Sequence, residues 1–248
     1  MRKLSIIILI LFLIEFNLRG GDLSKYDKRL GKQVLIPEGN YYVGSNDAED
    51  EKPLRIMHFK AFYIDIHPVT NIQYLTFLQE SNYKVEGDFN IKKAVNKPLY
   101  PATNITLNDA SAYARYYERR LPTEWEWEVA ARSLKKENIY AWGSKIEDDK
   151  CNWLKNINEP RYITAVFEYP PNEIGLYDMA GNVYEWTTSE YPKEFLTGKN
   201  IFKYKIVVLR GGAWTNIIYD LRASMRVPFA ANRYLDWVGF RTVKEYNK

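Results

Sequence analysis

Val-Val-Leu-Arg-Gly-Gly-Ala-Trp at residues 207–214, with Val-Gly-Phe-Arg at 238–241, is the most informative part of this chain. Two further segments belong with it: Gly-Leu-Tyr-Asp-Met-Ala-Gly-Asn-Val-Tyr-Glu-Trp at 175–186 and Arg-Leu-Pro-Thr-Glu-Trp-Glu-Trp-Glu-Val-Ala-Ala-Arg at 120–132. From Ser133 onward the pattern is one of short runs separated by Gly, Pro and Asn. This half of the chain is therefore predicted to contain a few short strands and many long loops.

The composition is that of a folded domain. A chain of 248 residues with 46% hydrophobic and 27% charged residues is globular and long enough to bury a sizeable core. The 20 Tyr and 7 Trp suit a loop-rich fold or a binding face, because these rings bury a large area and keep a polar end. The net charge of +4 is spread along the sequence without a run of Lys and Arg, so no nucleic-acid partner is expected.

The N-terminus is typical of an export signal. Positive residues precede an unbroken apolar run at 4–14, which has the length of a signal peptide and is short for a membrane span. No small-x-small cleavage site follows in 16–21, so we expect either a cleaved signal or a retained anchor. The predicted organisation is a signal peptide or anchor with linker at 1–30 and one domain at 31–248, exported to the periplasm or cell envelope. Membrane attachment is expected only through this N-terminal segment.

Local patterns predict the first elements of the domain. Residues 33–44 favour two short strands around Pro-Glu-Gly, which predicts a β-hairpin. Three helices are expected to begin directly after capping threonines, the second of them ending near Arg119: Thr70, Thr106 and Thr123. Glu124 and Glu128 follow the third threonine, and we assign them to stabilising the positive end of that helix rather than to catalysis.

Taken together, these segments are similar to the formylglycine-generating enzyme, or sulfatase-modifying factor, domain. Ile-Pro-Glu-Gly-Asn-Tyr-Tyr-Val-Gly-Ser at 36–45, Phe-Tyr-Ile-Asp at 62–65 and Val-Thr-Asn at 69–71 extend the resemblance over nearly the whole domain. The resemblance implies an α/β (α+β) fold with a C-type lectin-like core, few regular elements and long loops. The same family contains hercynine oxygenases, pyoverdine-maturation proteins and ligand-binding variable proteins, so the fold alone does not determine the function.

The copper chemistry of the family enzymes is not expected in this chain. Those enzymes hold copper(I) between two thiolates shortly after the Arg-Gly-Gly segment, and copper(I) prefers soft ligands. The resemblance places the first thiolate at Asn216 and the second near Tyr219 or Asp220, and none of these side chains is a soft donor. The single cysteine, Cys151, lies in another segment and is expected to be a small buried hydrophobic residue.

The sequence leads to different expectations for iron and for calcium. A non-haem iron site needs two His and a carboxylate facing one cavity, and the chain has only His58 and His67, which we expect to be structural. Structural Ca²⁺ is more plausible, since the resemblance implies hard oxygen ligands from Asn182 and Glu185. The alternative is that Asn182 adopts a turn conformation and Glu185 pairs with an arginine.

The remaining candidate is a binding surface. The resemblance implies a ligand groove lined by Trp214, Asn216, Arg222, Arg226, Arg233 and Trp237. Alternatively, Arg210, Arg222, Arg226 and Arg241 are internal ion-pair partners that hold long loops to the core. We expect an exported binding or accessory module of the cell envelope, whose partner is an exported protein or a small-molecule ligand. The alternative from another class is an oxidoreductase or maturation enzyme that modifies such a partner.

Overall fold

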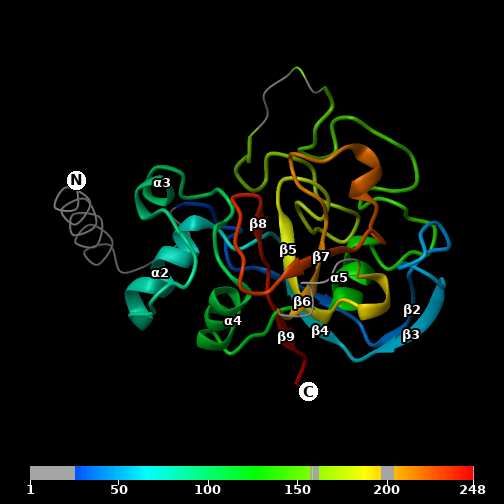
Figure 1. The fold of residues 1–248 in the computed structure, drawn as a ribbon, viewed down its shortest axis with the longest axis horizontal. Helices are drawn as coiled ribbons and strands as arrows, with labels where there is room; N and C mark the ends of the chain where they lie inside the picture. The colour runs from blue at the N-terminus through cyan, green and yellow to red at the C-terminus, as the bar shows by residue number, and fades with distance from the viewer. Residues whose placement is uncertain (1–25, 157, 159–161, 197–203, 248) are drawn as a thin grey trace.

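The chain forms a mixed arrangement of helices and sheets, described for residues 26–156, 158, 162–196 and 204–247 in a computed structural model (Figure 1). In chain order the described elements are β1 (Gln33–Ile36), β2 (Gly39–Val43), β3 (Arg55–Phe59), β4 (Phe62–Asp65), α2 (Asn71–Ser81), α3 (Ile91–Asn96), α4 (Leu107–Tyr116), α5 (Glu124–Ala131), β5 (Tyr184–Glu190), η2 (Lys193–Phe195), β6 (Ile206–Arg210), η4 (Ile218–Leu221), β7 (Val227–Ala230), β8 (Val238–Gly239) and β9 (Val243–Glu245). The expected mixed fold with few regular elements and long loops is confirmed.

The strands form separate small sheets rather than one large sheet. The orders are β1-β4-β9, β2-β3 and β7-β6-β5-β8, and in the last sheet β5 runs antiparallel to β6 and parallel to β8. Figure 1 shows the central β5–β6 pair with α2, α3 and α4 on one side and α5, β2 and β3 on the other. The two ends of the sequence signature, in β6 and β8, therefore lie on either side of β5.

The predicted β-hairpin at 33–44 is wrong. Both strands exist, but β1 pairs with β4 and β2 pairs with β3, so the two strands belong to different sheets. Their connection is Pro37-Glu38, which lacks the Asn-Gly or Gly-Gly residues that a tight hairpin turn requires. The chain instead reverses between β2 and β3, and the returning strands β3 and β4 run antiparallel to β2 and β1.

The three predicted helix starts are confirmed. Each begins directly after its threonine, and the side chains of Gln73, Asp109 and Glu126 accept hydrogen bonds from the backbone N–H groups of those threonines. The helix α4 ends at Tyr116, earlier than Arg119, because Glu118 has a left-handed backbone with φ of 55° that cannot continue a helix. The short helix α3, which Asn90 caps, was not predicted.

Two hydrophobic clusters form the core on the two sides of β5. One packs strands β1 and β4 against α5 and contains Trp127, while the other packs α2 and α4 against β5, β6 and β8 and contains Trp186. Both indole side chains are fully buried. Because α5 contacts β2, β5 and β6, it ties the N-terminal strands to the C-terminal sheet.

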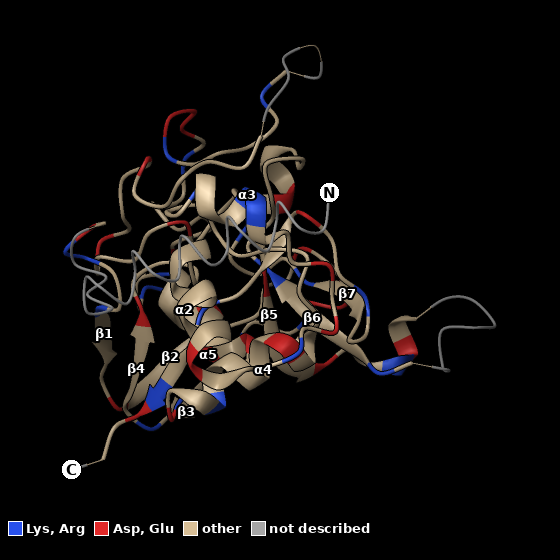
Figure 2. Cartoon of the chain, turned by 90° about the vertical axis from the view of Figure 1, so that its left-hand side faces the viewer, with Lys and Arg blue, Asp and Glu red and all other residues tan. Residues whose placement is uncertain are grey.

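Charged residues are distributed over the whole chain. Figure 2 shows Lys and Arg interspersed with Asp and Glu, with neither sign gathered in one region. The expected signal segment lies outside the described residues up to residue 25, whereas Arg29 is described and its guanidinium lies 3.7 Å from the centre of the Phe167 ring. Within the described part of the chain, no helix is long and apolar enough to cross a membrane.

Candidate ligand face and the buried charges that support it

The loop that follows β6 begins at a turn that only glycine can make. Gly211 and Gly212 have φ values of 99° and 73°, and a Cβ on Gly212 would lie 2.3 Å from the Cδ2 atom of Leu221. The preceding residue, Arg210, is fully buried and directs its guanidinium at α5. The turn and the buried arginine together fix where the loop 213–222 leaves the sheet.

Two carboxylates of α5, those of Glu124 and Glu128, form ion pairs with Arg210. Nη2 of Arg210 lies 3.0 Å from Oε2 of Glu124 and 2.9 Å from Oε2 of Glu128. Glu128 also accepts from Nε of Arg132 at 2.9 Å and from the backbone N–H of Gly44 at 2.8 Å. We predicted only a capping and dipole role for Glu124 and Glu128. Their carboxylates also neutralise buried arginines, which is the larger role.

Two of the expected groove residues are buried in ion pairs. Arg222 makes a bidentate pair with Glu51, at 2.8 Å for each nitrogen–oxygen contact, and Arg226 makes one with Glu124 at 2.7 and 2.8 Å. Burial opposes ionisation of Glu51, but hydrogen bonds from Arg222 and Ser45 lower the pKa of this carboxyl below its usual value. Arg222 and Arg226 are thus arranged as the internal alternative describes, holding the end of the loop to the core.

Other expected groove residues stay at the surface. Trp214 is half-buried, and its ring lies 6.3 Å from the ring of Tyr162, which is 68% exposed. Asn216 is half-buried and accepts from the backbone N–H of Ala213 at 3.0 Å, while its Nδ2 donates to Asp220 at 3.1 Å. We use "loop face" for the surface formed by Tyr162, Trp214, Asn216, Ile217 and Tyr219.

Trp237 and Arg233 lie farther along the chain. The half-buried Trp237 packs against Tyr184 and Phe229, with ring centres 5.5 and 5.9 Å apart. Burial raises the pKa of Tyr184 to about 12, with Asp220 adding to the rise and the side chain of Asn216 opposing it, so Tyr184 lies between Trp237 and the loop face. Arg233 is exposed in the turn after β7, and among the described residues no hydrogen bond or ring contact joins its side chain to the loop face.

The residues at the expected thiolate positions do not fit copper(I). Asn216 presents an amide that is already hydrogen-bonded, Tyr219 lies under the guanidinium of Arg222 at 4.3 Å, and Asp220 accepts from Asn216. Hard oxygen and amide atoms are poor ligands for a soft monovalent ion. Cys151 is 3% exposed in a different loop, and a second thiol to pair with it does not exist in the sequence.

The expected calcium ligands are engaged with protein groups. Glu185 is fully buried and accepts from Nε and Nη2 of Arg241 at 2.7 and 2.8 Å and from Nε1 of Trp127 at 2.8 Å. Asn182 has a left-handed backbone with φ of 62°, and its Oδ1 accepts from the backbone N–H of Thr164 at 3.0 Å. The alternative of a turn asparagine and an arginine-paired glutamate describes this geometry, and calcium binding through these two residues stays a prediction.

Asp178 is the functional candidate that sequence reasoning missed. It is buried, and its Oδ2 atom has no hydrogen-bond partner among the described residues. Burial raises its pKa to about 7, with Arg241 opposing and Glu185 adding to the rise. Since unpartnered buried carboxylate oxygens are rare and hard oxygens suit Ca²⁺, Asp178 fits a cation better than Asn182 does. Its place in the 175–186 segment, four residues before Asn182, was the available signal.

The fold and the loop face define a mixed α+β domain whose surface loop is held by buried arginines. Residues 21–246 match the family described as Sulfatase-modifying factor enzyme 1-like domain. The chain belongs to this family.

Relatives of the chain carry different functional names. Over 247 residues it is 33% identical to serine/threonine-protein kinase pkn1 of Chlamydia pneumoniae, covering 88% of this chain and 38% of that protein. It is 30% identical to inactive C-alpha-formylglycine-generating enzyme 2 of Mus musculus, over 84% of this chain and 84% of the relative. The structure of PvdO from Pseudomonas aeruginosa has the same fold, with a TM-score of 0.72, 24% identity, and coverage of 88% of this chain and 96% of PvdO. The chain thus spans well under half the length of the kinase that it resembles.

Proposed function

We propose that this protein is an exported binding or accessory module of the cell envelope that uses the loop face to hold an exported protein or a small-molecule ligand, and that it is not a copper oxidase. The observation that carries the proposal is the hydrogen bonding of the Asn216 side chain. At the position where the resemblance implies the first copper thiolate, a hydrogen-bonded amide closes the loop on itself by bonding to Ala213 and Asp220. The site is therefore arranged to present a surface rather than a soft metal ion.

The loop face has the composition of a binding surface. Tyr162, Ile217 and Tyr219 are 68%, 55% and 53% exposed, so large apolar groups are available on two neighbouring loops, which the Tyr162–Trp214 ring contact joins. The indole N–H of Trp214 is buried and has no hydrogen-bond acceptor among the residues that the structure describes. An unpaired buried donor costs about 1–3 kcal/mol, so an acceptor supplied by a ligand would relieve that cost.

The anchoring of the loop supports the same proposal. Arg210 holds its beginning through Glu124 and Glu128, and Arg222 holds its end through Glu51. A loop fixed at both ends loses less conformational entropy on binding than a free one. A relative that is named an inactive formylglycine-generating enzyme is consistent with a role for this domain outside catalysis.

The experiment is photo-crosslinking in cells that express the full chain, with a photoreactive amino acid at position 219. Position 116 is the matched control, because Tyr219 and Tyr116 are 53% and 44% exposed and Tyr116 lies at the end of α4. We expect a specific adduct from position 219 that is lost in Tyr162→Ala and is absent from position 116. Equal adducts at both positions would contradict a dedicated loop face.

Metal analysis of the purified full chain separates the rival function. We expect no stoichiometric copper or iron, since the chain offers one cysteine and two histidines. Copper or iron at one atom per chain would overturn the binding proposal in favour of an oxidoreductase or maturation enzyme. Protease accessibility of the chain in intact cells, compared with permeabilised cells, tests export separately.

A further inference from the structure

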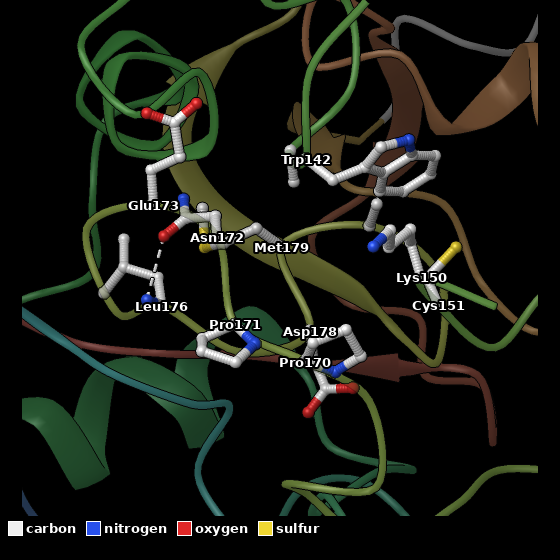
Figure 3. Close-up of a pocket in the computed structure, with 12 residues that line it drawn as sticks. Trp142, Lys150, Cys151, Pro170, Pro171, Asn172, Glu173, Leu176, Asp178 and Met179 are labelled. Carbon is white, nitrogen blue, oxygen red and sulfur yellow. Dashed lines mark hydrogen bonds between the residues drawn. The ribbon is translucent and has the colours of Figure 1, made fainter. Parts of the chain in front are cut away.

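A cavity of about 190 Å³ lies between the loop around 141–151 and the loop 170–180 (Figure 3). The described residues that line it include none from the loop face. The lining carries charged groups of both signs, because Lys150, Glu173 and Asp178 all contribute to it. A cavity of roughly 150 Å³ is enough for benzene, whereas one water molecule takes up about 30 Å³. The space therefore suits a small organic molecule rather than a single water molecule or ion.

The buried anion of the lining is Asp178. This residue is 7% exposed, and its Oδ2 atom has no hydrogen-bond partner among the residues that the structure describes. Its other oxygen, Oδ1, accepts from Nδ2 of Asn182 at 3.4 Å, which is long for a hydrogen bond. A buried carboxylate without a charged partner is costly, and a bound cation offsets that cost. Asp178 therefore favours a ligand that carries a positive group.

The other polar acceptors that face the cavity are already used. Glu173 is exposed and pairs with Lys135, which does not line the cavity. Oδ1 of Asn172 accepts from the backbone N–H of Leu176 at 2.9 Å, the bond drawn dashed in Figure 3, and its Nδ2 donates to a carbonyl oxygen of α5 at 2.9 Å. Of the two carboxylates on the described lining, Asp178 is therefore the one left to meet a ligand.

The cation of the lining is weakly held. Nζ of Lys150 lies 3.3 Å from Oε2 of Glu147, and the two side chains are 30% and 46% exposed. An exposed pair of this kind contributes little, so Lys150 can exchange Glu147 for the anion of a ligand at small cost. In Figure 3, Lys150 lies on the side of Trp142, whereas Asp178 lies on the side of Pro170. The wall thus offers one group of each charge at different places, which favours a ligand that carries both charges.

We propose that this cavity binds a small zwitterion, of the class of free amino acids with a short side chain. The ammonium of the ligand donates to Oδ2 of Asp178, and its carboxylate replaces Glu147 as the partner of Lys150. The wall is fixed in place beforehand, as is usual for small-molecule sites, because the ring of Trp142 stacks on Tyr140 with ring centres 5.0 Å apart. The site is separate from the loop face, so the proposal does not depend on the function proposed above.

The test is an NMR titration of the full chain with L-alanine, which is about the size of benzene, in the presence of a chelator. Two molecules of nearly the same shape separate its charges: lactate has a hydroxyl in place of the ammonium, and alaninamide has an amide in place of the carboxylate. The resonances followed are the indole N–H groups of Trp142 and Trp214, each assigned from its Trp→Phe variant. We expect alanine to move the Trp142 signal and leave the Trp214 signal in place.

The two ends of the ligand should contribute unequally. Lactate should bind roughly 10- to 100-fold more weakly than alanine, which is the size of a hydrogen bond between a charged donor and a buried carboxylate. Alaninamide should bind roughly two- to fivefold more weakly, which is the size of an exposed charge pair. Lys150→Met should reduce the affinity for alanine to that for alaninamide, and Asp178→Asn should reduce it to that for lactate. Because Asp178 is buried, the ligand series on the wild type tests the same contact if that variant does not fold.

Lys145→Met is the matched control, since Lys145 is exposed in the same loop and does not line the cavity. This variant should bind alanine as the wild type does, and both lysine variants remove only a surface charge, so folding is retained. The absence of a Trp142 shift at millimolar alanine would overturn the proposal, and a Trp142 shift with Ca²⁺ alone would then assign the cavity to a metal ion. A shift at Trp214 instead of Trp142, or equal affinities for alanine and lactate, would overturn it as well.

Discussion

Glu124→Gln should cost far more stability than its position at the start of a helix suggests. Its Oε2 lies 3.0 Å from Nη2 of Arg210 and 2.7 Å from Nε of Arg226, and its Oε1 lies 2.8 Å from Nη2 of Arg226. The side chains of Arg210, Arg226 and Glu124 are 0%, 5% and 3% exposed. Glutamine removes the negative charge and turns an NH₂ donor toward guanidinium donors, so the buried Arg226 loses its carboxylate partner and Arg210 keeps only Glu128.

Breaking a buried ion pair in this way costs about 3–5 kcal/mol. In a domain of this size each kcal/mol lowers the melting temperature by about 2–4 °C, so the expected loss is roughly 6–20 °C. Because a domain has a free energy of unfolding of only about 5–15 kcal/mol, the variant should also unfold at clearly lower urea concentration.

Urea and thermal unfolding of wild type, Glu124→Gln and Glu190→Gln at neutral pH provide the measurement. Glu190 pairs with Lys205 at 3.3 Å, and their side chains are 69% and 52% exposed, so its loss should cost less than about 1 kcal/mol. The double variant Glu124→Gln/Arg226→Met should recover part of the stability, because it removes the cation that loses its carboxylate partner. Equal effects of Glu124→Gln and Glu190→Gln would refute the view that Glu124 neutralises buried arginines.

Three further predictions concern single sites. Gly212→Ala should destabilise by several kcal/mol because the new Cβ meets Leu221, whereas Gly31→Ala, with φ of 76° and no atom within 4 Å of its Cβ, should cost about 1 kcal/mol in chemical unfolding. Burial lowers the pKa of His67 to about 4, so the folded state takes up fewer protons than the unfolded state between that value and the ordinary pKa of about 6.5. Stability from His67 is therefore complete above pH about 6.5 and is lost, by up to roughly 3 kcal/mol, as the pH falls to about 4, and the loss should disappear from the pH profile of His67→Gln. Added Ca²⁺ should raise the melting temperature of the wild type and leave Asp178→Asn unchanged, while an unchanged wild type would argue against a calcium site.

Local signals in the sequence were enough for the helix starts and not for the strand partners. Thr70, Thr106 and Thr123 each act together with the residue three positions on, so four consecutive residues contain the whole signal for each helix start. The pairing of β1 with β4 depends on contacts between residues about thirty positions apart, and the pattern at 33–44 carries no information about them.

In the candidate site, too, local features could be predicted from the sequence and long-range partners could not. Trp214 and Asn216 were predicted to line a ligand groove, and both are half-buried in the loop 213–222, so their place in a groove stays a prediction. The partners of Arg222 and Arg226 are Glu51 and Glu124, more than a hundred residues away. The sequence alone therefore could not decide between a surface role and an internal role for these two arginines. Asp178 was overlooked because its missing partner is a property of the packed core.

The loop 213–222 carries its fixed points at its ends and its exposed groups between them. Thr215, Ile217 and Tyr219 are exposed and alternate with half-buried residues, while the turn at Gly211-Gly212 and the Arg222–Glu51 pair lie outside that stretch. Substitutions at Thr215 and Ile217 change the chemistry that the loop offers without touching what holds it, whereas the ring of Tyr219 stacks on the guanidinium of Arg222 and so belongs to the anchor. Surface changes at the first two positions usually alter stability by less than about 0.5 kcal/mol. The loop is therefore suited to diversification there: a library randomised at positions 215 and 217 should yield folded proteins that present different surfaces.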